Sequence, residues 1–419
     1  MNILQINGYE TPGARFHGLA ITPLLKKHGV ESQHFAWRKD TNNPDILSFK
    51  SIHEKISHKI YQKTEDLLSL QSVIYPYARK IMALPAFKQA DLIHLHIIHS
   101  GFFSLRHLPE LTKQKPTVWT LHDPWALTGH CIHPFECDRW KIGCGSCPDL
   151  KTPFSMRRDN TKFQFSYKKE SYENSDLDIV VASKWMKDMV EASPMLRNAH
   201  VHVIPFGLDL TYFSPLDSKK ARMRFGIPEE AIVLSFRAED EPFKGLSYII
   251  EALEKLKGND PIYLLTLSSA RLKKRVSNRF QIVELGWVYD QEIVRDVYRA
   301  CDIFLMPSLA ESFGMMAVEA MACEKPVIVF EGTALPDVTF APEVGIAVPN
   351  RDSHALSEAI QRLIDHPEER IERGKKCREI AEKVYSEKAH VQAMVNLYKD
   401  VLNKSKNKNR SKNIKVFGK

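Results

Sequence analysis

One carboxylate stands alone in an apolar segment, and its setting indicates chemistry with a charged ligand. Residues 315–323 are all apolar except Glu319, so the helix expected there is buried on nearly every side. A lone buried carboxylate is costly unless a partner satisfies it. The free N–H groups at the start of such a helix form an anion site a few residues away. We therefore expect a ligand that carries an anion beside a diol, as a nucleotide does.

The expected nucleotide contacts come from both backbone and side chain. The phosphate would lie on the amides of Phe313, Gly314 and Met315, while Glu319 would accept hydrogen bonds from both ribose hydroxyls. The alternative is that Glu319 pairs with a Lys or Tyr of the core. The residue alone leaves both interpretations open.

The elements around this acid form a strand, a loop, a helix and a second strand. Residues 303–306 are a short apolar strand that Pro307 ends. A polar loop over 308–314 leads into the helix. Glu311 in that loop precedes Glu319 by eight positions, which gives the pattern E-x7-E.

This stretch resembles the donor-site motif of the family 4 retaining glycosyltransferases, which have the GT-B fold. The segments in the order and spacing of that family are residues 307–308, 311–314, 319–321 and 325–327. Glu324 departs from the pattern, because the family usually has Gly there. The resemblance implies that Glu311 holds hydroxyls of the transferred sugar, that Ser312 belongs to the donor site, and that no catalytic metal is needed.

Two basic residues in the second half have the pattern of a diphosphate site. Arg237 stands at the end of a strand over 232–236, and Lys244 precedes a helix over 246–256. A cation has the wrong sign for a helix N-terminus unless an anion binds there. The resemblance assigns both to the donor diphosphate and places the nucleobase near Val288. The alternative is that both are solvated basic residues.

The first half begins with a strand over 2–7 and a loop over 8–18, where the resemblance implies that Gly13 lies against the donor phosphates. A strand over 117–121 delivers His122 and Asp123 to its carboxyl end, the edge that faces ligands in open α/β sheets. The family has a His in this T-x-H-D context that contacts the transferred sugar, and Asp123 would orient its imidazole. The alternative for His122 is a satisfied structural histidine.

Four cysteines lie within seventeen residues, and they are the ligand set of a structural zinc in a reducing compartment. Free thiols are the alternative. With its flanking residues, this insert resembles a subgroup of family 4 enzymes that builds bacterial surface polysaccharides, such as colanic-acid-like exopolysaccharide, capsule or O-antigen. The four are Cys131, Cys137, Cys144 and Cys147.

Composition suits two α/β domains, with 419 residues of which 43% are hydrophobic and 26% charged. No apolar run approaches a membrane span and the first residues lack a signal-peptide pattern, so we expect a cytoplasmic protein. Ile52, Ile56 and Ile60 form a stripe flanked by lysines, which could rest on the anionic inner face of the cell membrane; the alternative is an ordinary outer helix. The mild net charge of +8 owes much to the C-terminal tail, and no nucleic acid is expected.

We therefore predict an α/β protein of the GT-B fold, with two Rossmann-like doubly wound domains facing each other across a cleft. Residues 1–205 would form the acceptor-side domain with a Cys-rich insert at 131–147, and 206–386 the donor domain. Residues 387–403 would be a helix that crosses back, and 404–419 a basic, disordered tail.

The predicted activity is a retaining hexosyl transfer from a nucleotide-diphosphate sugar to a lipid-linked saccharide, without a catalytic cofactor. Two alternatives remain: a nucleotide-sugar epimerase on the same fold, and a non-catalytic partner subunit.

Overall fold

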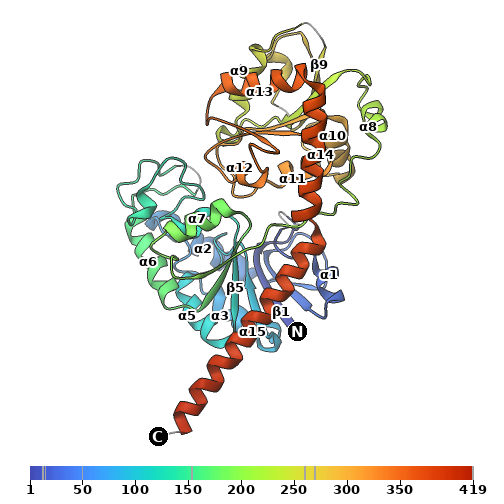
Figure 1. Ribbon diagram of the computed structural model, residues 1–419. Coiled ribbons are helices and arrows are strands. Elements are labelled where there is room, and N and C mark those ends of the chain that lie inside the picture. Colours follow the sequence, from blue (N-terminus) through green and yellow to red (C-terminus); the bar gives the residue numbers. More distant parts are fainter. Residues whose placement is uncertain are drawn as a thin grey trace. The chain divides into compact units, whose positions relative to one another are not determined.

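The computed structural model describes residues 1–417 except 12, 13, 15, 50, 152, 153, 259, 260 and 269, with backbone alone for 409–417. The chain divides into two units (Figure 1). Unit 1 comprises residues 1–207 and 388–419, and unit 2 comprises residues 208–387. Each unit contains one parallel sheet with helices between its strands, which confirms the predicted α/β class.

The sheet of unit 1 has seven strands in the order β3-β2-β1-β4-β5-β6-β7. The central strands are buried along their length, as expected for a parallel sheet covered by helices. The strands are β1 (Asn2–Tyr9), β2 (Glu31–Arg38), β3 (Ile46–Leu47), β4 (Leu92–Leu95), β5 (Thr117–Leu121), β6 (Leu177–Val181) and β7 (His200–Val203).

Local sequence explains where the helices of unit 1 begin. Ser51 caps α2 by accepting a hydrogen bond from the N–H of His53. Pro23 lies in the first turn of α1, where a missing N–H is tolerated, so the helix starts at Thr22. The helices are α1 (Thr22–Lys27), α2 (Ile52–Leu68), α3 (Tyr77–Ala83), α4 (Pro85–Gln89), α5 (Leu108–Gln114), α6 (Thr161–Glu173) and α7 (Lys184–Ala192).

Helix α15 (Glu387–Phe417) completes the core of unit 1. Val391, Met394 and Tyr398 are buried in a cluster with Ile3 and Val118. The helix continues through residues 404–417, for which the sequence predicts a disordered tail. The lysines and arginines of that segment have high helix propensity and extend a helix that packing has already started.

The sheet of unit 2 has six strands in the order β10-β9-β8-β11-β12-β13. The first strand of the unit, β8, lies between β9 and β11, so the strand order reverses on either side of it. Ligands bind at such a switch point in open parallel sheets. The strands are β8 (Ile232–Arg237), β9 (Ile262–Leu267), β10 (Phe280–Glu284), β11 (Ile303–Met306), β12 (Val327–Phe330) and β13 (Ile346–Val348).

The helices of unit 2 lie between and after these strands. The turn from α11 to β12 forms although Glu324 replaces the usual Gly, because Glu324 adopts a left-handed φ of 60°. The helices are α8 (Ser218–Arg224), α9 (Leu246–Glu254), α10 (Gln291–Ala300), α11 (Met315–Ala322), α12 (Leu335–Val338), α13 (Ser353–Asp365) and α14 (Pro367–Val384).

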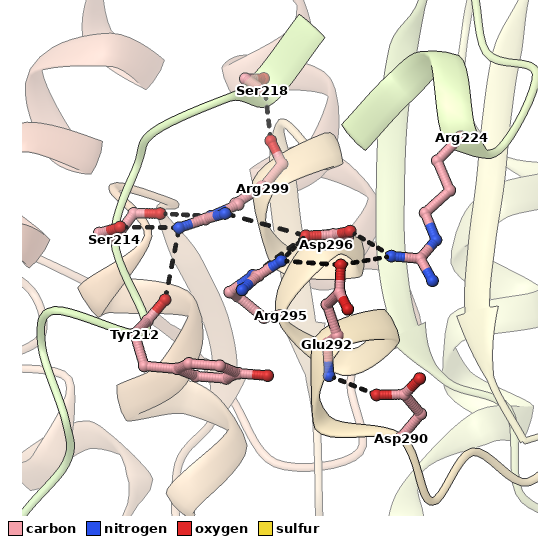
Figure 2. A network of polar contacts seen from close by, with 9 residues as sticks. All are labelled: Tyr212, Ser214, Ser218, Arg224, Asp290, Glu292, Arg295, Asp296 and Arg299. Carbon is pink, nitrogen blue, oxygen red and sulfur yellow. Dashed lines mark hydrogen bonds and ion pairs between the residues drawn. The ribbon is translucent and has the colours of Figure 1, made fainter. Parts of the chain in front are cut away.

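A polar network holds α10 against the segment before α8 (Figure 2). Arg299 is buried and donates to the carbonyl and the hydroxyl of Ser214, both at 2.8 Å. Asp296 accepts from Arg224 at 2.7 Å and from Arg295 at 2.9 Å. The network fixes the position of α10, which carries a residue of the candidate site.

None of the helices in the described residues combines the length and the apolar character that a transmembrane span requires.

Candidate functional site

Two loops meet at the switch point of unit 2, after β8 and after β11. Lys244 ends the first loop and Glu311 lies in the second, and the Lys244 Nζ is 2.8 Å from the Glu311 Oε1. The two backbones also bond, because the N–H of Leu309 donates to the carbonyl of Phe243 at 2.8 Å. Both residues therefore lie in loops beyond the carboxyl ends of two neighbouring strands.

Gly245 allows this close approach. It has a φ of 77°, and a Cβ on it would lie 2.0 Å from the carbonyl oxygen of Pro307. No side chain fits there without moving the second loop. The glycine therefore sets the short distance between Lys244 and Glu311.

Arg237 lies at the end of β8 and contacts two partners. Its Nε is 2.7 Å from a carboxylate oxygen of Glu239, and its guanidinium lies 4.8 Å from the centre of the Trp287 ring. Trp287 is 58% exposed, beside the half-buried Val288. Trp287 lines a cavity of about 640 Å³ together with Ser268 and residues 238–242.

Glu239 was missed from the sequence. The sequence pattern gave no signal for it, because a tight turn after β8, in which the N–H of Glu239 donates to the carbonyl of Arg237 at 3.1 Å, brings the two side chains together.

Helix α11 begins at Gly314 without a side-chain cap. Gly314 has a φ of 94°, and a Cβ there would meet Leu335 at 2.4 Å. Phe313 is buried and packs edge-on against Tyr385, while Ser312 and Met315 are half-buried. An uncapped helix start is compatible with an anion on these amides, which stays a prediction.

Glu319 is fully buried in α11. The hydroxyl of Tyr298, on α10, donates to its Oε2 at 2.7 Å. This is the arrangement that the core alternative predicts. The contact of Glu319 with ribose stays a prediction, and it requires the carboxylate to become accessible when a nucleotide binds.

In unit 1, His122 follows β5 and lies among other rings. It stacks on Phe206, with centroids 5.5 Å apart and planes inclined by 9°. Its Nε2 is 3.1 Å from the Nδ1 of His96, whose Nε2 lies 2.8 Å from the Oε1 of Gln5.

The hydrogen bonds assign the tautomer of His122. Because the Gln5 oxygen accepts, His96 donates from Nε2 and accepts at Nδ1, so the Nε2 of His122 carries the proton. The Nδ1 of His122 then presents a lone pair, and it is buried without a hydrogen-bond partner among the described residues. Burial and then the charge of His17 lower the pKa of His122 to about 3, so the ring is neutral near pH 7.

Asp123 does not orient His122, contrary to our expectation. Its carboxylate pairs with the Nε2 of His99 at 3.2 Å and caps the next turn by accepting from the N–H of Trp125. Gly13 lies outside the described residues.

The four insert cysteines are half-buried and not disulfide-bonded. Burial raises the pKa of Cys131 to about 11 and that of Cys144 to about 12. In the part of the chain that the structure describes, no group of three or more Cys, His, Asp or Glu side chains is placed to hold a metal. The arrangement of Cys131, Cys137, Cys144 and Cys147 therefore lends no support to zinc, which stays a prediction.

Lys168, fully buried, lies next to this insert. It donates to the carbonyls of Trp125 at 2.6 Å and Thr128 at 2.9 Å, and its Nζ lies 3.4 Å from the centre of the Trp125 ring. Burial lowers its pKa to about 7. The pattern of the sequence gave no signal for this residue.

Comparison with known proteins identifies both units. Residues 21–212 match the family described as Glycosyltransferase Family 4, and residues 217–384 match Glycosyl transferases group 1. The chain is 29% identical over 333 residues to a D-inositol 3-phosphate glycosyltransferase of Corynebacterium glutamicum (strain R), covering 74% of this chain and 72% of the relative.

Solved structures agree on the fold. A sucrose-phosphate synthase from Thermosynechococcus elongatus superimposes with a TM-score of 0.68 at 19% identity, covering 96% of this chain and 99% of that one. HepE of Anabaena in complex with UDP gives a TM-score of 0.66 at 17% identity, covering 96% and 100%. The predicted GT-B fold is confirmed.

Proposed function

Because the chain joins two glycosyltransferase domains in the GT-B fold, we propose that it transfers a sugar, with retention, from a nucleotide-diphosphate sugar to a saccharide acceptor. The observation that carries this proposal is the contact of Lys244 with Glu311 across the switch point of unit 2. It gathers a cation for phosphate and a carboxylate for sugar hydroxyls at the sheet edge where ligands of such sheets bind.

Arg237 and Lys244 would neutralise the charge that develops on the leaving diphosphate. In the structure each has a carboxylate partner, Glu239 and Glu311 respectively. A diphosphate brings more negative charge than either carboxylate, so it would displace them from the cations. Glu311, once released, would accept hydrogen bonds from sugar hydroxyls.

The remaining donor contacts would come from backbone and aromatic surface. The amides of Phe313, Gly314 and Met315, with Ser312, would hold phosphate, and the segment of Trp287 and Val288 would contact the base. In unit 1, we assign the contact with the transferred sugar to His122. Its neutral ring offers a lone pair at Nδ1, which suits a hydroxyl donor on the transferred sugar.

The acceptor we propose is a lipid-linked saccharide in bacterial surface-polysaccharide synthesis, met at the inner face of the membrane. The support is an exposed apolar face on α2, where Ile52, Ile56 and Ile60 are 67%, 54% and 60% exposed. Vesicle sedimentation tests it: the protein should pellet with anionic vesicles at low salt and leave them at high salt. Equal binding to neutral vesicles, or binding to neither, would remove the membrane from the proposal.

The donor is tested by a panel of nucleotide sugars, with nucleotide release as the readout. Acceptors should be a bacterial lipid extract and D-inositol 3-phosphate, since the relative is named for the latter. Release should depend on one acceptor, and the new linkage should keep the anomeric configuration of the donor. Free epimer formed from donor alone would identify an epimerase instead.

Two lysine variants of unit 2 complete the test. Lys244→Ala should abolish most of the release, while Lys220→Ala, an exposed lysine on α8, should leave it unchanged. Equal rates for both variants would show that the site is misplaced.

A further inference from the structure

Unit 1 contains a cavity of about 1090 Å³ that the sequence did not reveal. Its walls are the residue at the carboxyl end of β1, the segment that ends β2, the loop after β4 and one side of α2. Tyr9, Trp37 and Gly101 line it on the side of the strands. His58 and Glu65 line it on the side of α2. The cavity therefore opens at the sheet edge where a ligand is expected in this topology.

The carboxylates that line this cavity already have partners. Glu54 pairs with Lys80 at 2.9 Å, and Asp66 pairs with Arg157. Glu65 is buried and accepts from the backbone N–H groups of residues 72–74. The remaining acid, Asp40, accepts from the hydroxyl of Thr11 at 2.7 Å.

The cations of the cavity are not matched in the same way. Arg38, Lys39, Lys55 and Lys59 line it, and among the described residues none of the four forms an ion pair with a carboxylate. Lys39 donates to the carbonyl of Ile46 at 2.7 Å. The guanidinium of Arg38 lies 5.7 Å from the centre of the Tyr9 ring. These four cations outnumber Asp40 and Glu65, the two lining acids whose printed donors are neutral, so the cavity favours an anionic occupant.

Aromatic rings line the same cavity beside these cations. Trp37 is half-buried, stacked on Phe102 with planes inclined by 8° and 4.9 Å from the His58 ring. The Nε2 of His58 is held 2.6 Å from the carbonyl of Gly101. Rigid aromatic surface beside charged groups is typical of sites for polar ligands with an apolar face, such as sugars.

The lysines of the cavity also border an apolar surface. Lys55 and Lys59 share a face of α2, and each directly precedes one of the exposed residues Ile56 and Ile60. Helical geometry places Ile52, Ile56 and Ile60 on a stripe next to the lysines. Positive charge thus lies between a cavity and exposed hydrocarbon.

We propose that this cavity is the acceptor subsite and that the acceptor is a phosphorylated amphiphile. Its phosphate would lie beside Arg38, Lys55 and Lys59, its polar head against Trp37 and His58, and its hydrocarbon along the isoleucine stripe. This inference deepens the proposed function and rests on it, because an acceptor is what that activity requires.

Binding of three probes to the whole protein tests the inference. The probes are monomeric dioctanoyl phosphatidic acid, its uncharged counterpart dioctanoylglycerol, and glucose 6-phosphate, which has the anion without hydrocarbon. The phosphatidic acid should bind at least fivefold tighter than either of the other two. Equal binding of the uncharged lipid would overturn the role of the cations, and equal binding of the sugar phosphate would overturn the amphiphile.

Matched variants locate the site. Arg38→Gln and Lys59→Gln should each weaken both anionic probes by about fivefold, while Lys27→Gln on α1 removes the same charge without effect. Ile56→Ser should weaken the lipid alone, and Ile142→Ser, at another exposed isoleucine of unit 1, should not. If a cavity variant bound the probes as tightly as its control variant does, the assignment would be overturned.

Titration of the same proteins with nucleoside diphosphates separates this inference from the proposed function. Every unit 1 variant should bind the diphosphate like wild type. Intact diphosphate binding with failed probe binding would refute the cavity and leave the proposed function standing.

Discussion

At the residue scale, each cation expected to bind diphosphate has a carboxylate partner. Lys244 and Glu311 are 21% and 17% exposed, and Arg237 and Glu239 are 29% and 25% exposed. Partly buried charges are costly without a partner, so the acids hold the cations in place before a ligand arrives. The same acids then compete with the ligand.

This competition gives opposite predictions for two partners in one ion pair. Lys244→Ala should weaken nucleoside diphosphate binding at least tenfold, because a charge-assisted contact is lost. Glu311→Gln should tighten it by about fivefold, because Lys244 is released from its partner, yet it should lower turnover. Calorimetric titration measures both, and a Glu311→Gln protein that binds the diphosphate more weakly would contradict the competition.

Glu319 and Tyr298 allow a second prediction. Tyr298→Phe should lower the free energy of unfolding by about 1–3 kcal/mol, because a buried carboxylate loses the hydrogen bond from the Tyr298 hydroxyl. Glu319→Gln should weaken the diphosphate and the bare nucleoside alike, by at least tenfold, because Gln replaces an acceptor with a donor. A folded Glu319→Gln protein with normal affinity for both ligands would leave Glu319 as a core residue alone.

At the element scale, local pattern predicted most of what positions the site. The bounds of β5 and β11 match the structure, because each is a short apolar run that turn or polar residues end. Lys244 and Glu311 lie in the loops that follow the central strands β8 and β11. The sequence could not reveal the Tyr298 partner of Glu319, the His99 partner of Asp123 or the cavity beside α2, since these depend on contacts between distant segments.

The network of Figure 2 predicts unequal roles for two acids of α10. Asp296→Asn should destabilise unit 2 by about 3 kcal/mol, because buried arginine charge is left unpaired. Glu292→Gln should change stability by less than about 1 kcal/mol, because its side chain is 57% exposed. Urea unfolding of both variants measures the difference, and equal midpoints would show that the network is not structural.

The zinc hypothesis for the cysteine insert can be tested by metal analysis. Zinc would have to displace protons from thiols whose pKa burial has raised, so binding must supply that free energy. The hypothesis predicts about one zinc per chain in freshly purified protein. It also predicts that Cys144→Ser lowers the melting temperature more than the donor affinity. If elemental analysis detected no metal, the four cysteines would be free thiols.

At the scale of the whole molecule, stability should depend on buried histidines. Burial, as the largest cause, lowers the pKa of His94 and His96 and brings that of His34 to about 4 and of His122 to about 3. All four are therefore neutral in the folded chain near pH 6, while in the unfolded chain they titrate near 6.5.

The sign of the pH dependence follows from these values. As the pH falls below about 6.5, the unfolded chain binds protons that the folded chain does not, so the free energy of unfolding decreases. The loss should reach roughly 1.4 kcal/mol per pH unit for each such histidine and continue until the folded rings titrate, near pH 4 for His34. Urea unfolding at pH 7.5, 6.0 and 5.0 measures it, and equal stability at all three would refute neutral burial.

Helix α15 has a consequence for the order in which the protein can fold during synthesis. Unit 2 is one continuous segment, 208–387, whereas unit 1 needs residues from both ends of the chain. Val391, Met394 and Tyr398 fill the core of unit 1 against residues that leave the ribosome hundreds of codons earlier. Until they emerge, Ile3 and Val118 lack their covering, and a nascent unit 1 exposes that apolar surface to chaperones while unit 2 is already able to close.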